Sequence, residues 1–224
     1  MSDQFGYTPN FNTPPSAPPG LSWSQTWIKA LTQPSVQSYE EIASDTPPSN
    51  NRAYAWVFVA ILISALINAL QSAVFPRTVV VQGVPYQQGF SILSVICSPV
   101  AGIVGVLGFA IFIAITQAIA GALGGTGSYP RLLYTVAAYS APFTILTSII
   151  ALIPIVNYLN AVLGIYGFVL SIQAVRAVNQ FGVGKAILSS CVIWILVAVV
   201  FAVVFLAIVG PAISNVYSNM IQGL

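Results

Sequence analysis

The sequence contains no histidine, and all four of its acidic residues lie within the first 45 positions. Only 4% of the chain is charged, whereas 57% is hydrophobic. After Arg52 the charged residues are Arg77, Arg131, Arg176 and Lys185. A soluble domain carries charge on roughly a quarter of its residues. The chain beyond Arg52 therefore lacks a charged shell, and we expect it to lie in the hydrocarbon of a membrane.

The same absences exclude several kinds of functional site. Without histidine there is no imidazole to act as a general base or to bind a metal or haem. Without carboxylates in the apolar part, a proton relay or sodium site built on Asp or Glu is not available. Serines are present but have no base partner. We predict that the protein is not an enzyme and has no metal or cofactor ligands, which leaves apolar contact with lipid, carotenoid or quinone.

The chain has two cysteines, Cys97 and Cys191. We expect them near opposite faces of the membrane, too far apart for a disulfide, and acting as small buried hydrophobes. The net charge of +2 is too small for a nucleic-acid-binding protein, so the expected partners are membrane lipids and other integral membrane proteins.

The N-terminal part divides into two segments. Residues 1–21 are rich in proline and read as a disordered tail without a secretory signal. Residues 22–51 contain short amphipathic helices, the first capped by Ser22 or Ser24, followed by a linker. Trp23 and Trp27 are expected to anchor this segment in the membrane interface. An alternative, compatible with the first, is that the same apolar face packs on the end of the helix bundle.

Residues 52–210 form the predicted membrane domain, and residues 211–224 a short outer tail. Five segments are apolar over a length sufficient to cross a bilayer: residues 53–74, 99–123, 132–153, 158–175 and 186–209. We therefore predict an all-α membrane protein, a bundle of five transmembrane helices preceded by an interfacial helix. Between the first two spans, residues 78–86 are β-prone and could form a hairpin. Residues 90–98 read as a re-entrant or interfacial segment.

The basic residues predict the orientation of this bundle. With the N-terminus inside, the inner segments contain Lys29, Arg52, Arg131, Arg176 and Lys185. The outer segments then contain only Arg77. Cytoplasmic loops carry an excess of Lys and Arg. We therefore expect the N-terminus inside and the C-terminus outside, with the basic residues Arg131, Arg176 and Lys185 in inner loops.

Polar residues within the spans are the remaining candidates for a site. Ser64, Asn68 and Gln71 recur at helical spacing on the first span, and Gln117 and Gln173 are possible partners on other spans. This polar stripe is either a set of hydrogen bonds between helices or a path for a polar solute. Pro142 interrupts the third span and is expected to be a structural kink. The glycine-rich segment 121–127 lacks a phosphate-loop ending and reads as a flexible inner turn that presents Arg131.

A family resemblance rests on these motifs. Residues 121–131 (Gly-Ala-Leu-Gly-Gly-Thr-Gly-Ser-Tyr-Pro-Arg) precede residues 138–142 (Ala-Tyr-Ser-Ala-Pro), and the stretch from Trp27 to Ile42 leads into the first span. Over roughly residues 22–210 the chain resembles the Yip family of membrane proteins. The resemblance implies five spans with the N-terminus inside and, for eukaryotic members, an association with Rab-type GTPases. The short N-terminal region is typical of a prokaryotic member, which would lie in the bacterial inner membrane.

The leading hypothesis is a non-catalytic membrane scaffold or adaptor. A specific form is an accessory subunit of a larger complex, for example a photosynthetic or respiratory one, acting by helix packing and by contact with lipid, pigment or quinone. The alternatives are a small transporter, channel or scramblase-like lipid-handling protein, and a trafficking adaptor that binds a small GTPase.

Overall fold

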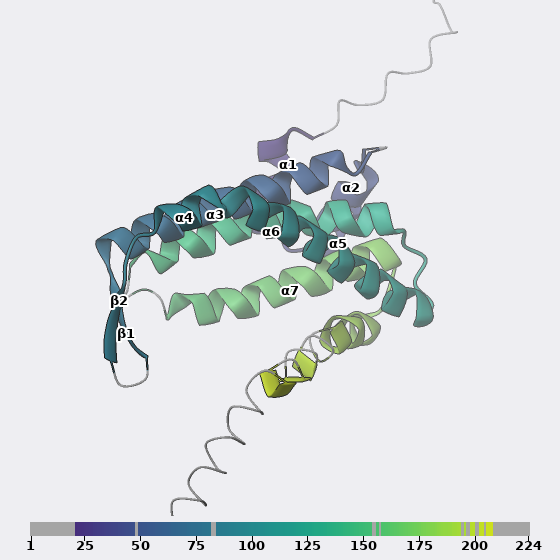
Figure 1. The fold of residues 1–224 in the computed structure, drawn as a ribbon. Coiled ribbons are helices and arrows are strands. Elements are labelled where there is room, and N and C mark those ends of the chain that lie inside the picture. Colours follow the sequence, from purple (N-terminus) through teal and green to yellow (C-terminus); the bar gives the residue numbers. More distant parts are fainter. Residues whose placement is uncertain are drawn as a thin grey trace, which may run out of the picture.

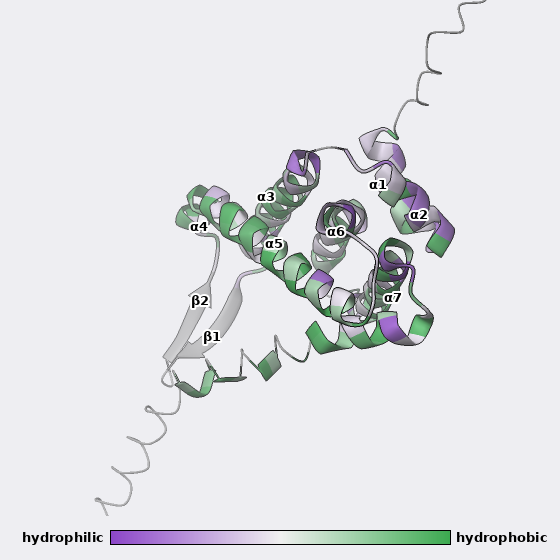
Figure 2. Cartoon of the chain, turned by 90° about the vertical axis from the view of Figure 1, so that its right-hand side faces the viewer, coloured by the Kyte–Doolittle hydropathy of each residue, from purple (hydrophilic) through white to green (hydrophobic). Residues whose placement is uncertain are grey.

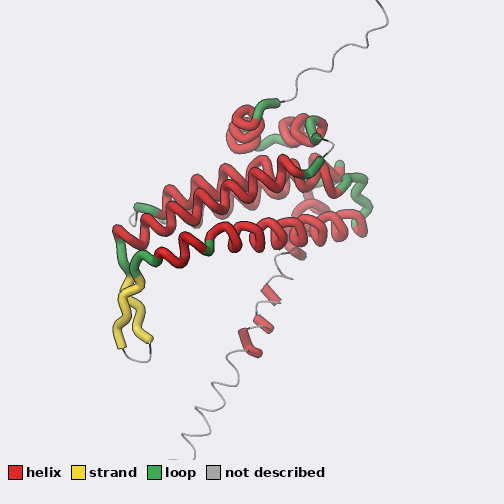
Figure 3. Tube along the Cα trace, turned by 45° about the horizontal axis from the view of Figure 1, so that its top comes forward, coloured by secondary structure: helices red, strands yellow, loops and turns green. Residues whose placement is uncertain are grey.

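The computed structural model describes residues 21–47, 49–81, 84–153, 156 and 158–193, and isolated residues between 195 and 207. The predicted N-terminal tail, apart from Leu21, and the predicted C-terminal tail lie outside the described residues. Helices make up most of this part of the chain, and one β-hairpin extends from the bundle (Figures 1 and 3).

Four long helices form the bundle, and each is long and apolar enough to cross a membrane. They are α3 (Asn51–Val74), α5 (Ser98–Ala122), α6 (Tyr129–Ala151) and α7 (Leu159–Asn179). At about 1.5 Å per residue, even the shortest spans about 30 Å, the thickness of a bilayer core. The first four predicted spans are confirmed as candidate spans, with ends within four residues of those expected.

The fifth predicted span stays a prediction. It begins as a shorter apolar helix, Val183–Ile193. The described residues between 195 and 207 are also helical, and the rest of this predicted span lies outside the described residues.

α6 is the central helix of the bundle. Half of its most apolar stretch is buried inside the protein, against 28% for α7 and 17% for α3 and α5. Figure 2 shows α6 surrounded by α3, α5 and α7, with hydrophobic residues along the outer helices and hydrophilic ones concentrated in the N-terminal helices and at helix ends. The outward-facing apolar side chains include Leu66, Ile103 and Leu107. An apolar exterior with a packed centre is the arrangement that hydrocarbon solvent requires.

The hairpin defines one end of the bundle. Strands β1 (Arg77–Val81) and β2 (Val84–Gln88) pair in antiparallel register, with Val79 opposite Tyr86. The hairpin predicted at residues 78–86 is therefore confirmed. The short helix α4 (Ile92–Ile96) follows it and leads into α5. We call this end the hairpin end, and the opposite end, where Arg52, Arg131, Arg176 and Lys185 lie, the basic end.

Two short helices, α1 (Trp23–Thr32) and α2 (Val36–Ser44), pack against the bundle. Ser22 caps α1 in a capping box, in which its hydroxyl accepts from the Gln25 N–H and its own N–H donates to Gln25 Oε1 at 3.0 Å. The predicted capping by Ser22 is confirmed. The cap fixes where the first helix begins, so that its apolar face meets α3 and α6.

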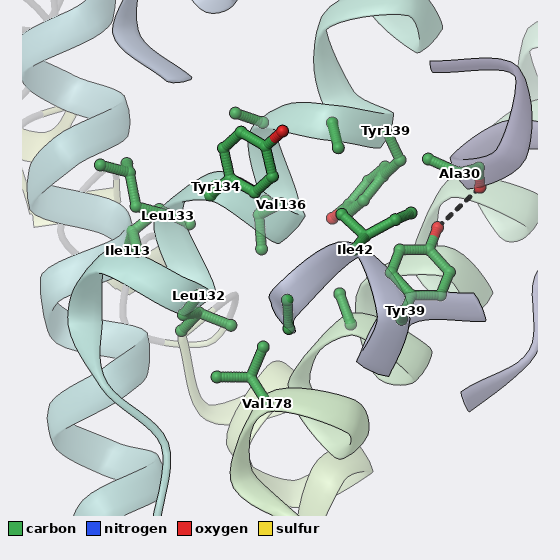
Figure 4. Close-up of a cluster of buried hydrophobic side chains, with 14 of the residues drawn as sticks. Ala30, Tyr39, Ile42, Ile113, Leu132, Leu133, Tyr134, Val136, Tyr139 and Val178 are labelled. Atoms are coloured by element: carbon green, nitrogen blue, oxygen red, sulfur yellow. Dashed lines mark hydrogen bonds between the residues drawn. The ribbon is translucent and has the colours of Figure 1, made fainter. Parts of the chain in front are cut away.

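The N-terminal helices bury their apolar face in the core. Tyr39 and Ile42 are fully buried, and the Tyr39 hydroxyl donates to the Ala30 carbonyl at 2.8 Å (Figure 4). The Tyr39 ring also lies 6.2 Å from that of Tyr139 on α6, edge to face. Packing on the bundle, one of the two predicted placements of this segment, is therefore present in the structure.

The two predicted interfacial anchors meet on a third tryptophan. Trp23 and Trp27 place their rings 5.7 and 6.0 Å from that of Trp56 on α3, both edge to face. Trp56 is fully buried, whereas Trp23 remains 48% exposed. Trp23 thus combines a bundle contact with an outward apolar surface, and its role as an interfacial anchor stays a prediction.

Candidate functional site

The predicted polar stripe joins α3 to α6. The Ser64 hydroxyl donates to the Thr144 carbonyl at 3.4 Å, and the Gln71 side-chain amide donates to the Ala151 carbonyl. Asn68 is exposed on the outer side of α3. Ser64 and Gln71 therefore act as hydrogen-bonding contacts between two helices, and Asn68 does not lie with them.

Gln117 and Gln173 do not join this stripe. The Gln117 amide donates to the Gly127 carbonyl at 2.8 Å and to Asn179 Oδ1 at 3.0 Å. Gln173 accepts from Arg176 Nη1 at 3.2 Å. α5 and α7 end at the basic end, so Gln117 and Gln173, which are late in these helices, lie toward that end. α3 begins at the basic end and runs the opposite way, so Gln71, which is late in α3, lies toward the hairpin end. Their expected partnership with the stripe is therefore not found.

Asn179, which the sequence analysis did not single out, anchors the glycine-rich loop. It is 1% exposed, and its Oδ1 would lie 2.6 and 2.7 Å from a Cβ placed on Gly125 and on Gly127. Gly124 has a φ of 87°, in the region that favours glycine. The loop was expected to be a flexible turn, but it packs directly on the end of α7. The sequence signal for this contact was a polar residue, Asn179, just after the fourth predicted span.

The three basic residues of the predicted inner loops have different surroundings. Arg131 and Lys185 are exposed, and Lys185 Nζ donates to the Leu123 carbonyl at 2.9 Å. Arg176 is half-buried, and its Nε has no hydrogen-bond partner. Within the described residues none of the three forms an ion pair, since the ion pair found there joins Lys29 to Glu41. The positive charges of Arg131, Arg176 and Lys185 are therefore not directly paired with a carboxylate of the described residues.

An apolar chamber lies between α5, α6, α7 and the helix that starts at Val183. Its volume is about 830 Å³, within the range typical of small-molecule sites. Four phenylalanines line it: Phe109, Phe112, Phe143 and Phe168. Cys191 and Ile195 close one side. Sequence reasoning missed this chamber, because it depends on how three helices diverge in space.

Two glycines of α7 shape the chamber. A Cβ on Gly167 would lie 2.9 Å from the Phe143 ring, so this glycine lets α6 and α7 approach closely. A Cβ on Gly164 would meet nothing within 4 Å, so this residue opens onto the chamber. The sequence signal for the chamber was the combination of phenylalanines on α5 and α6 with glycines on α7.

None of the described residues that line the chamber is charged. Its polar groups are the hydroxyls of Tyr139, Ser140 and Ser171 and the Cys191 thiol. Phe109 and Ser140 also line a smaller cavity of about 210 Å³ between α3, α5 and α6, so the two spaces are neighbours. Such a lining can hold a hydrocarbon ligand.

Comparison with known proteins assigns the family. The family model of the Yip1 domain matches residues 28–205, a range that contains α2 to α7, the hairpin and the second half of α1. No curated protein and no solved structure matched the chain. The match confirms the resemblance found in the glycine-rich loop and the segment that follows it. The chain belongs to the Yip1 domain family and is an integral membrane protein with several spans.

Proposed function

We propose that this protein is a non-catalytic membrane scaffold that holds an apolar molecule in its chamber and packs against other membrane proteins. The observation that carries the proposal is the chamber itself, about 830 Å³ in volume and lined mainly by phenylalanine and aliphatic side chains. A cavity lined in this way favours a ligand with hydrocarbon surface.

The polar stripe supports a scaffold over a transporter. A solute path needs side chains that are free to coordinate the solute, whereas Ser64 and Gln71 bond to the backbone of α6. Asn68 is exposed and makes neither of these contacts with α6. The stripe thus contributes to helix association, which stabilises a bundle by about 1 kcal/mol per hydrogen bond.

The proposed topology has five crossings, with the basic end in the cytoplasm of a bacterial cell. Arg52, Arg131, Arg176 and Lys185 gather at one end, and Arg77 begins the hairpin at the other. This asymmetry supports the assignment, because cytoplasmic segments are enriched in Lys and Arg. The helix that starts at Val183 would then continue across the membrane as the fifth span.

Ligand binding is tested by purifying the full chain in mild detergent and identifying bound lipids, quinones and pigments by mass spectrometry. Gly164→Phe fills the chamber, whereas Gly108→Phe adds the same ring on the exposed side of α5, where a Cβ also meets nothing within 4 Å. We expect the wild type and Gly108→Phe to retain an apolar ligand that Gly164→Phe loses. Equal retention by all three proteins would overturn the chamber as the site.

The scaffold role is tested by a native pull-down in the same detergent, with copurifying proteins quantified by mass spectrometry. A stoichiometric set of membrane proteins is the expected result. A lone chain with no stoichiometric partner would overturn the scaffold role and leave lipid handling as the function.

A further inference from the structure

We propose that the chamber takes one tail of an anionic phospholipid, whose phosphate lies at the basic end against Arg176 and Lys185. This inference rests on the proposed function, because it specifies the ligand of the same chamber.

The first argument is the position of the two cations along their helices. Arg176 follows the lining residue Ser171 by five positions on α7, which runs toward the basic end, and at 1.5 Å per residue this is about 7.5 Å. Lys185 precedes the lining residue Cys191 by six positions on a helix that starts at the basic end, which is about 9 Å. Along the axes of their helices, both cations therefore lie one to two turns beyond the chamber on its basic side. A phospholipid has the same order, with a phosphate a few ångströms outside the start of its tails.

The second argument is that both cations have hydrogen-bond donors without an acceptor among the described residues. Lys185 Nζ uses one of its three donors on the Leu123 carbonyl. Arg176 donates to Gln173, and its Nε has no acceptor within the described residues. No carboxylate of the described chain pairs with either residue. Phosphate oxygens would supply both the missing acceptors and the opposite charge.

The third argument separates a phospholipid from the other apolar ligands. A carotenoid or a quinone would fill the chamber but would bring no negative charge to Arg176 and Lys185. A zwitterionic lipid brings a phosphate together with its own cation. Basic residues at a membrane surface attract anionic lipids, so the charge pattern favours a lipid with net negative charge.

The test uses the full chain reconstituted in nanodiscs that contain equal amounts of phosphatidylglycerol and phosphatidylcholine with identical tails. The protein is extracted in mild detergent, and its retained lipids are counted by native mass spectrometry. We expect phosphatidylglycerol to be enriched about thirtyfold in the wild type, since each of the two cations favours an anionic lipid by about 1 kcal/mol. Because surface charge is screened by salt, the enrichment should fall when the exchange is run at high ionic strength.

Two variants locate the effect. Arg176→Gln combined with Lys185→Gln should bring the two lipids to equal retention while keeping the total. Arg131→Gln, which removes an exposed cation of the same end from a different helix, should leave the enrichment unchanged. Enrichment that survives the double substitution, or that is insensitive to salt in the wild type, overturns the inference.

The outcomes also separate this inference from the proposed function. Equal retention of both lipids by the wild type, with loss in Gly164→Phe, overturns the anionic headgroup and leaves the chamber as an apolar ligand site. Retention that Gly164→Phe does not change overturns both.

Discussion

At the residue scale, buried polar groups hold separate segments of the chain together. The Tyr39 hydroxyl is buried and bonded to the Ala30 carbonyl. Burial raises the pKa of Tyr39 well above its usual value near 10, since the phenolate would be desolvated. Asn179 has the corresponding role at the glycine-rich loop, where its side-chain oxygen accepts a hydrogen bond from the Gln117 amide. Helical spacing predicts that Tyr39 lies on the apolar face of its helix, whereas Asn179 did not stand out. The hydrogen bonds of both residues depend on partners in another helix, which spacing does not predict.

The raised pKa of Tyr39 gives a stability prediction with a defined sign. Because the folded-state pKa lies above the unfolded value, the stability that the neutral phenol contributes is present below about pH 10. It is lost as the pH rises beyond that value. Tyr39→Phe should lower the free energy of unfolding by about 0.5–1.5 kcal/mol at pH 8 and reduce its decline above pH 10. Unfolding in detergent followed by tryptophan fluorescence measures both.

The control is Tyr158→Phe, since Tyr158 is 86% exposed. It should unfold as the wild type does at every pH. An alkaline decline that is the same in Tyr39→Phe and in the wild type would argue against a role for this hydroxyl.

The glycine-rich loop gives a second prediction at this scale. A Cβ on Gly127 would lie 2.7 Å from Asn179 Oδ1 and from the Val178 carbonyl, and a backbone carbonyl cannot easily move. Gly127→Ala should lower the free energy of unfolding by about 1–3 kcal/mol. Gly121→Ala, where a Cβ meets nothing within 4 Å, should be neutral or slightly stabilising. Equal thermal midpoints for the two variants in detergent would contradict the tight packing of this loop.

At the element scale, the sequence predicts what depends on local pattern. Hydropathy alone placed the ends of the first four spans to within four residues, and the β-prone residues 78–86 predicted the hairpin. The polar stripe shows where local pattern fails. At 100° per residue, Ser64 and Gln71 differ by about 20° around α3, whereas Asn68 lies about 40° from Ser64. Helical spacing groups all three, but only the packing of α6 decides that Asn68 falls outside the contact.

The stripe can be tested by comparing two substitutions on α3. Gln71→Leu removes the hydrogen bond to the Ala151 carbonyl and should lower the free energy of unfolding by about 0.5–1.5 kcal/mol. Asn68→Leu replaces an exposed polar side chain with an apolar one and should be neutral or stabilising in lipid. Unfolding in mixed micelles with increasing dodecyl sulfate gives both values. A larger loss for Asn68→Leu would mean that Asn68 contacts a partner that the bundle alone does not supply.

At the scale of the whole molecule, the basic residues and the chamber lie at different positions along the length of the helix bundle. The basic end carries the cations, the chamber lies at the middle of α5, α6 and α7, and the apolar exterior faces lipid. The sequence predicts the basic end and the apolar exterior but not the chamber, because the chamber is formed by helices that are separated along the chain. The basic residues that predict orientation also lie where a phosphate would complete the chamber.

The two native cysteines report this arrangement without engineered labels. Cys97 is exposed and lies at the hairpin end, just before α5, whereas Cys191 lines the chamber. With the basic end in the cytoplasm, a membrane-impermeant maleimide should modify Cys97 in right-side-out spheroplasts. It should leave Cys191 unmodified until the membrane is dissolved. Cys97→Ser should abolish the labelling of spheroplasts. Labelling of Cys97 only in inside-out vesicles would reverse the proposed orientation, and labelling of Cys191 in intact spheroplasts would mean that water, rather than hydrocarbon, fills the chamber.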